Sequence, residues 1–237
     1  MDESREKYAL ITGATKGIGR AIAYRLAQAG YHLLLIARSE ANLTEYQKEL
    51  QAAYSTINVM IYPCDLSIES DLRECAVSID ANCPQIDVLI NNVGLFHAGS
   101  ILDIPLAEMK VLFDINYFVA QYLSAFFGNK MAKVGSGHII NIGSIAAEQA
   151  TEHASAYSVT KFALHGLTVN LRAALAPKGI KVSEVIPGAT WTSSWEGSDL
   201  PREKFVTADD VARAVVACLS VGETANVEEV VVKPFYR

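Results

Sequence analysis

Three residues near the middle of the chain have side chains that could act together on one oxygen atom. Ser144 follows a short apolar stretch, Tyr157 comes thirteen residues later, and Lys161 four residues after that. The segment 154–176 is predicted to be a helix with Ser155 as its cap, which places Tyr157 and Lys161 on one face, about one turn apart. A nearby ammonium lowers the pKa of a tyrosine, and a serine can hydrogen-bond an oxygen on which charge develops. These residues indicate a site that moves a proton onto or off a carbonyl or alcohol oxygen.

The spacing Tyr-x-x-x-Lys also occurs on ordinary amphipathic helices, so this interpretation needs support from the rest of the chain. Tyr8–Thr12 reads as a strand and runs directly into a turn that contains Gly13, Gly17 and Gly19. A helix is predicted from 20 to 29. Glycines allow the backbone to approach a pyrophosphate, and the helix dipole favours its charge. This order of elements predicts a binding site for the phosphates of a dinucleotide.

Strand and helix patterns alternate along the whole chain. Further strands are predicted at 32–37, 58–62, 86–90, 138–142, 180–186 and 227–232, and further helices at 40–53, 68–79, 106–134 in two segments, 154–176 and 208–220. This alternation predicts an α/β fold with a doubly wound parallel sheet, a Rossmann fold of three α/β/α layers. No repeat or linker interrupts it. We expect one domain over 1–237, with a cofactor half of about 1–115 and a catalytic and substrate half of about 116–237.

The end of the second predicted strand bears on the choice of cofactor. Arg38 follows this strand, and Lys16 lies inside the glycine turn. In a doubly wound fold this position is beside the adenosine ribose, where an acidic residue binds the 2′-hydroxyl of NAD and an arginine suits a 2′-phosphate. Each charge alone also fits a solvated surface residue. Together they predict NADP(H) in preference to NAD(H).

Polar residues mark the ends of other predicted elements. Asp65 follows the third strand and could accept from the adenine amino group, while Ser67 could cap the next helix. Asn92 and Gly94 follow the fourth strand, at the edge where such sheets bind ligands. Asn116 stands in an apolar helical stretch, and a buried asparagine must find partners. It could be a structural bridge or part of a proton path.

Composition excludes several classes of protein. The formal net charge of -6 and the pI near 5.4 argue against nucleic-acid binding, which requires a basic face. No apolar stretch approaches the roughly 18 residues of a membrane helix, and the charged N-terminus lacks a signal-peptide core. The four cysteines show no metal-type spacing and read as buried, reduced thiols. We therefore expect a cytoplasmic protein with no metal, membrane or nucleic-acid partner.

In combination, these motifs resemble the short-chain dehydrogenases/reductases over essentially the full length of the chain. TGATKGIG at 12–19 is similar to the cofactor turn of this family, and NNVG at 91–94 to its Asn-Asn-Ala-Gly motif, with Val93 where alanine is usual. Asn116, Ser144, Tyr157 and Lys161 match its catalytic tetrad in order and spacing. PGATWT at 187–192 matches its nicotinamide-side loop.

The resemblance implies a hydride transfer between NADP(H) and a carbonyl or secondary alcohol. Tyr157 would give its proton to the carbonyl oxygen, Ser144 would hold that oxygen, and Lys161 would bind the nicotinamide ribose and depress the tyrosine pKa. Asn116 would hold a water that links Lys161 to solvent. The expected cofactor-binding residues are Gly13, Thr15, Lys16, Gly17, Ile18, Gly19, Arg38, Asp65, Leu66, Asn92, Gly94, Tyr157, Lys161, Pro187, Gly188, Thr190 and Thr192.

The substrate pocket is expected to be aromatic. We predict that Phe96, Gln149, Trp191 and Trp195 contact the substrate and that the segment after Gly188 closes over it as a lid. The alternative for Trp195 is a contact between subunits. The resemblance also implies a homo-oligomer, a dimer or tetramer formed through the helices around 116–134 and 155–176.

Three functions compete. The first is an NADP-dependent carbonyl reductase acting on a small molecule, and the second a 3-oxoacyl-(acyl-carrier-protein) reductase acting on an acyl thioester. The third is a cofactor-binding regulator without catalysis, which the intact tetrad disfavours. An acyl carrier protein is acidic, and the lysines that could receive it are Lys130, Lys133, Lys178 and Lys181. Lysines at helix ends also complement the helix dipole, and the patch contains no arginine, so we favour a free substrate.

Overall fold

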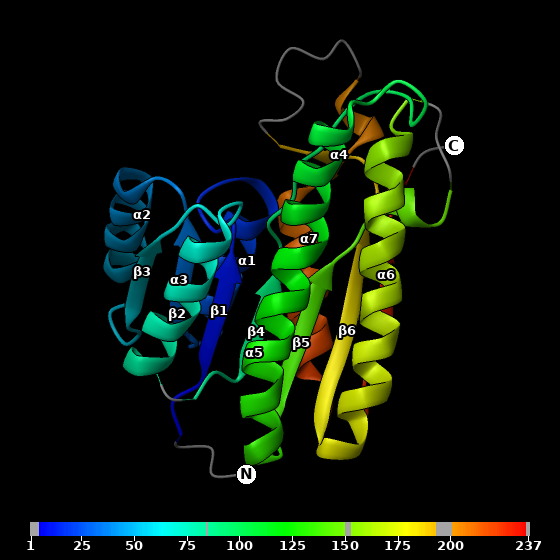
Figure 1. Ribbon diagram of the computed structural model, residues 1–237. Helices are drawn as coiled ribbons and strands as arrows, with labels where there is room; N and C mark the ends of the chain where they lie inside the picture. Colours follow the sequence, from blue (N-terminus) through cyan, green and yellow to red (C-terminus); the bar gives the residue numbers. More distant parts are fainter. Residues whose placement is uncertain (1–4, 84, 150–152, 193–200, 236–237) are drawn as a thin grey trace.

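The protein folds around one parallel β-sheet with helices on both faces (Figure 1). The computed structural model describes residues 5–83, 85–149, 153–192 and 201–235. Seven strands pair in the order β3-β2-β1-β4-β5-β6-β9. They are β1 (Tyr8–Thr12), β2 (His32–Ala37), β3 (Val59–Pro63), β4 (Val88–Asn91), β5 (Gly137–Ile142), β6 (Ile180–Pro187) and β9 (Glu229–Val232). The doubly wound architecture predicted from the alternation of elements is confirmed.

Two layers of helices cover the sheet. One face carries α1 (Gly17–Gln28), α2 (Glu40–Ala53) and α7 (Ala208–Ser220), and the other carries α3 (Glu69–Asn82), α5 (Val119–Val134) and α6 (Ser155–Leu175). The helix α4 (Leu106–Phe113) extends the column of α5 beyond the carboxyl ends of the strands (Figure 1). A short two-stranded ribbon joins β7 (Thr190–Trp191) to β8 (Val206–Thr207). No helix in the described ranges is both long and apolar enough to cross a membrane.

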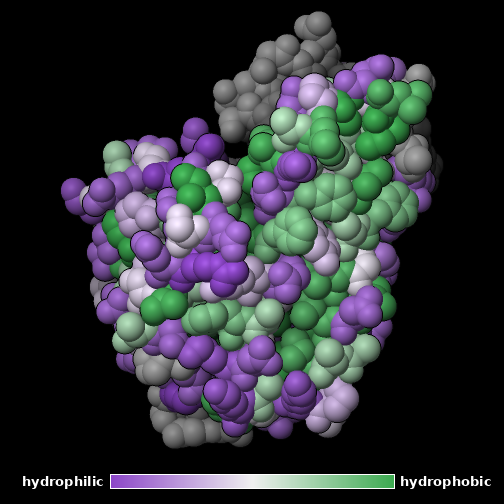
Figure 2. Space-filling model, in the orientation of Figure 1, coloured by the Kyte–Doolittle hydropathy of each residue, from purple (hydrophilic) through white to green (hydrophobic). Residues whose placement is uncertain are grey.

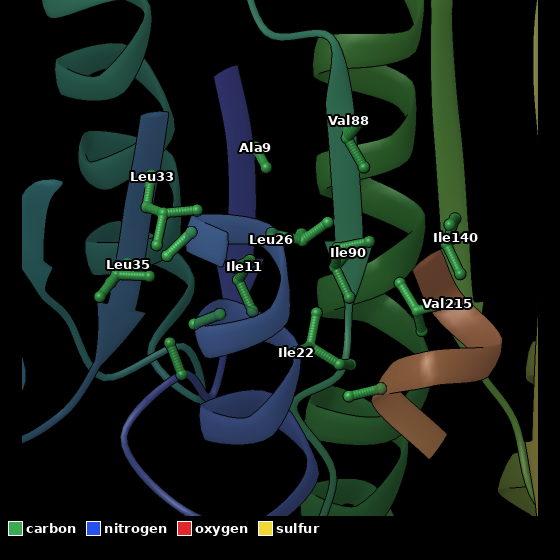
Figure 3. Packing of buried hydrophobic residues seen from close by; sticks show 14 of the residues in the cluster. Ala9, Ile11, Ile22, Leu26, Leu33, Leu35, Val88, Ile90, Ile140 and Val215 are labelled. Atoms are coloured by element: carbon green, nitrogen blue, oxygen red, sulfur yellow. The ribbon is translucent and has the colours of Figure 1, made fainter. Parts of the chain in front are cut away.

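Strict alternation along each strand sends side chains into two separate cores. In β2, Leu33 and Leu35 face α1 and α2, whereas Leu34 and Ile36 face the layer of α3 and α5. Figure 3 shows the first core, where Ile22 and Leu26 of α1 lie among the strand residues. Burying one such side chain contributes roughly 1.5–3 kcal/mol to stability. The inner strands are buried on both faces and are largely apolar, with polar residues at strand ends and at a few buried sites, whereas the edge strands β3 and β9 are partly exposed.

A chain of buried polar side chains fixes α5 and α6 against the sheet. The amide of Asn91 on β4 donates to Ser124 of α5 at 2.9 Å and to the side-chain oxygen of Asn141 on β5 at 2.8 Å. The amide of Asn141 donates in turn to Thr168 of α6 at 2.8 Å. Unpaired amides would be costly at these positions, so the network selects one register between helices and strands.

Two predicted helix caps are wrong. The N-cap of α6 is Ala154, and the hydroxyl of Ser155 instead accepts from the backbone N–H of Ile101 at 2.6 Å. This bond ties the 95–101 segment to the start of α6, so the hydroxyl serves a distant loop rather than its own helix. The N-cap of α3 is Ile68, because Ser67 donates to Asp65 at 2.7 Å.

Candidate active site

Most of the residues predicted to bind a cofactor line one groove at the carboxyl ends of the strands. The groove lies where β1 and β4 are neighbours and the chain order reverses, which is where open α/β sheets bind ligands. Its volume is about 720 Å³. From the predicted set it is lined by Gly13, Thr15, Lys16, Gly17, Ile18, Arg38, Asp65, Leu66, Asn92, Gly94 and Thr192.

The glycine turn is held in place by close backbone contacts. Gly13 has a φ of +66°, and Gly19 approaches it so closely that an added Cβ would lie 2.3 Å from the Gly13 carbonyl oxygen. The side-chain amide of Asn92 donates to the Thr12 carbonyl at 2.8 Å. The Thr12 hydroxyl accepts from the backbone N–H groups of Asn92 and Val93, both at 2.9 Å. The end of β4 therefore shapes the turn that opens α1.

Two exposed cations, Lys16 and Arg38, line this groove, and in the described ranges neither forms an ion pair. The carboxylate of Asp65 lines the same groove. Two hydrogen bonds from Ser67 lower the pKa of Asp65, with a smaller contribution from Arg38. Exposed cations beside a helix N-terminus favour an anionic ligand.

The predicted catalytic residues gather at the end of β5. Ser144 follows this strand, and the ammonium of Lys161 donates to the carbonyl of Ile142 at 2.9 Å. Lys161 is only 4% exposed, and its Nζ lies 5.8 Å from the centre of the Tyr157 ring. A Cβ placed on Gly94 would come within 3.7 Å of the Lys161 Nζ, so the cluster borders the groove that Gly94 lines. The structure thus places Lys161 beside Tyr157 and ties it to the backbone two residues before Ser144, next to the Gly94 wall of the groove.

Asn116 is a buried bridge between two segments. Its side-chain oxygen accepts from the Leu95 backbone N–H at 2.7 Å, and its amide donates to the Leu95 carbonyl at 3.0 Å and to Thr160 at 2.9 Å. The residue lies in a turn of π-helix, Asp114–Phe118, that joins α4 to α5. Such single turns are frequent at functional sites. Of the two roles left open by the sequence, the contacts in the structure show the structural bridge.

The predicted substrate residues lie in different surroundings. Phe96 is exposed, and its ring meets the ring of Tyr157 edge-on at 5.2 Å. Gln149 is also exposed, beyond a turn of 3₁₀-helix that follows Ser144. Trp191 packs against Phe205 at 5.1 Å, and the Arg202 guanidinium lies over its ring. Trp195 lies outside the described residues, as does much of the predicted lid.

The predicted nicotinamide-side loop begins where β6 ends. The backbone N–H of Gly188 donates to the carbonyl of Val232 in β9, and the Thr190 hydroxyl donates to the Gly188 carbonyl. These bonds hold Pro187, Gly188 and Thr190 at the carboxyl edge of the sheet. Thr192 reaches the glycine turn, because a Cβ on Gly17 would lie 3.0 Å from its methyl group. Only Thr192 of this loop lines the groove.

The lysines considered for carrier docking lie at the wrong edge of the sheet. Lys130 and Lys133 lie in the last turns of α5, Lys178 follows α6 and Lys181 is in the first residues of β6, whereas Ser144 lies where β5 ends (Figure 1). Lys130 pairs with Asp80 at 2.6 Å, and Lys181 donates to the Gly222 carbonyl at 2.7 Å. In a parallel sheet the two edges are a strand length apart. These lysines therefore do not form a basic patch near Ser144, Tyr157 and Lys161.

Several positioning residues were not predicted. Thr12 holds the end of β4, Thr160 holds Asn116, and Ser39 and Asn42 line the groove beside Arg38. A polar residue at the end of the apolar strand 8–12 was an available signal for Thr12. Thr160 carried none, because its partner is 44 residues away in sequence.

Comparison with known proteins places the chain in a family. The family model described as short chain dehydrogenase matches residues 7–201. An oxidoreductase of Staphylococcus epidermidis, itself described as uncharacterized, is 30% identical over 234 residues, which cover 99% of this chain and all of the relative. A similar protein of Staphylococcus saprophyticus is 31% identical over 234 residues. The chain belongs to the short-chain dehydrogenase family and is an oxidoreductase of that family.

Solved structures agree with this assignment. An alcohol dehydrogenase from the archaeon Thermococcus sibiricus, complexed with 5-hydroxy-NADP, superposes with a TM-score of 0.89 at 26% identity, covering 98% of both chains. A metagenomic short-chain oxidoreductase in complex with NADP has a TM-score of 0.84 at 29% identity, again covering 98% of both chains.

The packing of the glycine turn generates a test. In Gly19→Ala the new methyl group meets the Gly13 carbonyl and the Asn92 amide, so the turn must move. We expect NADPH affinity to fall at least tenfold and the melting temperature to drop, because overpacked sites commonly lose about 1–3 kcal/mol. Gly166→Ala is the matched control, because nothing lies within 4 Å of its added Cβ. Fluorescence titration and thermal melting measure both effects, and equal NADPH affinity in Gly19→Ala and wild type would contradict the geometry.

Proposed function

We propose that this protein is an NADP(H)-dependent reductase of carbonyl compounds, or dehydrogenase of the corresponding secondary alcohols, acting on a small molecule. The observation that supports the proposal is buried Lys161, which lies beside the Tyr157 ring and donates to the carbonyl of Ile142, two residues before Ser144. Its ammonium is close to Gly94, which lines the groove that Lys16 and Arg38 also line. Proton chemistry on an oxygen is thereby set beside a binding site for a phosphorylated ligand.

The groove fits a nicotinamide dinucleotide in shape and charge. The glycine turn at the start of α1 would hold the pyrophosphate, Asp65 and Leu66 the adenine, and Arg38 with Lys16 the 2′-phosphate. Asn92, Gly94 and Thr192 would line the path toward the catalytic cluster. The 187–192 loop would border the nicotinamide. When bound, the cofactor supplies or accepts the hydride.

The chain's own residues would manage the proton and the orientation. Tyr157 gives its phenolic proton to the substrate oxygen during reduction and takes it back during oxidation, and Ser144 donates a hydrogen bond to that oxygen. Lys161 is held by the Ile142 carbonyl at 2.9 Å, so its charge stays fixed on the Tyr157 side of the groove. Asn116 fixes the backbone of Leu95, next to Phe96, whose exposed ring would form one wall for the substrate. Gln149 and Trp191 would complete that pocket.

A 3-oxoacyl-(acyl-carrier-protein) reductase uses the same chemistry and remains the alternative. The lysines that would have favoured it lie at the opposite edge of the sheet, so they give docking no support. A regulator that binds cofactor without catalysis would retain the groove but would not need Ser144, Tyr157 and Lys161 together. Measuring the turnover of a panel of ketones, sugars and free oxoacyl thioesters with NADPH distinguishes these three functions.

Tyr157→Phe tests the catalytic assignment. The substitution keeps the ring that packs on Phe96 but removes the transferable proton. We expect turnover with the best substrate of the panel to fall about a hundredfold or more, typical for loss of a general acid, while NADPH affinity is nearly unchanged. Tyr54→Phe, on the opposite helical layer beside Tyr24, serves as the control and should keep full activity. Comparable turnover in Tyr157→Phe would remove Tyr157 from the mechanism.

Arg38→Asp tests the cofactor preference. Wild type should prefer NADPH to NADH, because charge-assisted hydrogen bonds to a phosphate contribute roughly 1.5–3 kcal/mol each. The aspartate would repel the 2′-phosphate and accept from a 2′-hydroxyl, so the ratio of kcat/KM for the two cofactors should reverse. Arg73→Asp changes the same charge on α3, where Arg73 pairs with Glu69, and should leave the ratio unchanged. A wild-type preference for NADH would refute the role given to Arg38.

The exposed apolar face of α4, α5 and α6 supports self-association. Figure 2 shows hydrophobic residues gathered over these helices. Phe118 is 51% exposed and Phe162 46% exposed, with Val111, Val159 and Val169 also exposed nearby in the chain. Soluble monomers rarely expose apolar surface in one continuous patch. The proposal is a homo-oligomer in which a second copy of the chain covers this face.

Light scattering checks the oligomeric state. Wild type should be a dimer or tetramer at micromolar concentration, and Phe118→Lys combined with Phe162→Lys should give monomers, since two charges would be buried in the interface. Tyr24→Lys alters an exposed aromatic residue of the opposite helical layer and should leave the assembly intact. A monomeric wild type would overturn the proposal.

A further inference from the structure

A buried carboxylate lies behind the catalytic cluster and belongs to none of the roles above. Glu184 is in β6, between β5 and β9, and is completely buried, with 0% of its surface exposed. Its Oε2 is 2.8 Å from Nδ1 of His165 on α6. Its Oε1 has no hydrogen-bond partner among the described residues. A carboxylate is costly to bury and needs a physical reason.

The unpaired oxygen is pressed against the segment that carries Ser144. A Cβ placed on Gly143 would lie 2.3 Å from Oε1 of Glu184, so only glycine fits beside this carboxylate. The residue before Gly143 is Ile142, whose carbonyl accepts from the Lys161 ammonium at 2.9 Å. The residue after it is Ser144. One glycine therefore separates the acceptor of Lys161 from the serine, and the Glu184 carboxylate packs on that glycine.

Lys161 contributes to the electrostatics of Glu184 without forming an ion pair with it. In the described ranges Lys161 has no carboxylate within ion-pair distance, although it is almost fully buried. The charged groups that face Glu184 are His165 and Lys161 from α6 and Glu229 from β9, and Glu229 is itself near Arg172 at 3.8 Å. Burial raises the pKa of Glu184 above its ordinary value, and the hydrogen bond with His165 and, more weakly, the charge of Lys161 oppose this rise. His165 is four residues after Lys161 and its side chain is 37% exposed, so it connects the buried carboxylate to solvent.

We propose that Glu184 is a positioning residue whose carboxylate balances the Lys161 ammonium and braces the Ile142–Ser144 segment, while His165 keeps that carboxylate ionised. The inference rests on the proposed function, because it explains how Lys161 and Ser144 are held for work on the substrate oxygen. It predicts an electrostatic effect at Tyr157 that a purely structural glutamate would not produce.

Glu184→Gln tests the charge while keeping the shape. A negative charge near titrating groups raises the pH at which they lose their protons, so its removal should move those transitions to lower pH. In the reducing direction, activity falls as Tyr157 ionises. We expect this alkaline fall in kcat/KM to move down by roughly one pH unit in Glu184→Gln.

A double-mutant cycle assigns the role of His165. His165→Gln removes the group that opposes the rise in the pKa of Glu184 on burial, so less of the carboxylate is ionised. The pH profile of kcat/KM should therefore move to lower pH, as in Glu184→Gln, but by a smaller amount. Added to Glu184→Gln it should produce no further shift, because its effect passes through the carboxylate. Asp209→Asn removes the carboxylate of the Arg25–Asp209 ion pair between α1 and α7, remote from the cluster, and should change stability without moving the profile.

A second readout keeps the test independent of turnover. The near-ultraviolet phenolate absorbance of each variant, minus that of the same variant carrying Tyr157→Phe, reports the ionisation of Tyr157 directly. Its midpoint should also fall in Glu184→Gln.

If wild type turns over carbonyls but neither the pH profile nor the absorbance midpoint moves in folded Glu184→Gln, the inference is overturned and the proposed function stands. If no carbonyl is turned over, the proposed function fails, and the midpoint alone decides the inference. Should Glu184→Gln not fold, His165→Gln, which alters a partly exposed side chain, decides by the same two measurements.

Discussion

The hydrogen bond from the Lys161 ammonium to the Ile142 carbonyl is the contact on which the site depends. It ties α6 to the end of β5, and with it Tyr157 to Ser144, across 19 residues of sequence. The ammonium is almost completely buried, so it cannot be held by solvent and must be balanced by the protein. The carbonyl of Ile142 accepts a hydrogen bond from it, and the balancing charge is the role proposed for Glu184. The orientation of the catalytic side chains follows from this local constraint.

At the other end of the groove the cations are exposed rather than buried. Lys16 and Arg38 are exposed and lack carboxylate partners in the described part of the chain, so their charges are available to a ligand. The backbone beside them is rigid, because Thr12 and Asn92 bond the end of β4 to the glycine turn. A rigid turn with available cations binds phosphate at a small entropic cost. The exposed cations at this end are suited to orienting a dinucleotide. The buried ammonium of Lys161 at the other end is suited to a proton transfer.

Most of the fold was accessible from sequence because each strand and helix has a strong local pattern. β1, β2, α2 and α7 begin and end where the apolar periodicity and the flanking glycines and caps predict. The π-helical turn at Asp114–Phe118 was not predicted, because it is imposed by the bonds of Asn116 to Leu95 and Thr160 rather than by local preference. The caps assigned to Ser67 and Ser155 were wrong for a related reason, since each hydroxyl has a different partner that the sequence pattern does not show.

The sequence by itself indicated the family and the residues proposed for catalysis, Ser144, Tyr157 and Lys161, since both depend on residue type and on spacing along single elements. Only the tertiary structure decided which distant residues meet. It set Phe96 against Tyr157, turned Trp191 toward Phe205, and placed the lysines after α5 and α6 at the far edge of the sheet. It also placed the Glu184 carboxylate against Gly143 and within hydrogen-bond distance of His165. These contacts join different strands, helices and loops, and their distances are fixed by packing, which no periodicity within one segment encodes.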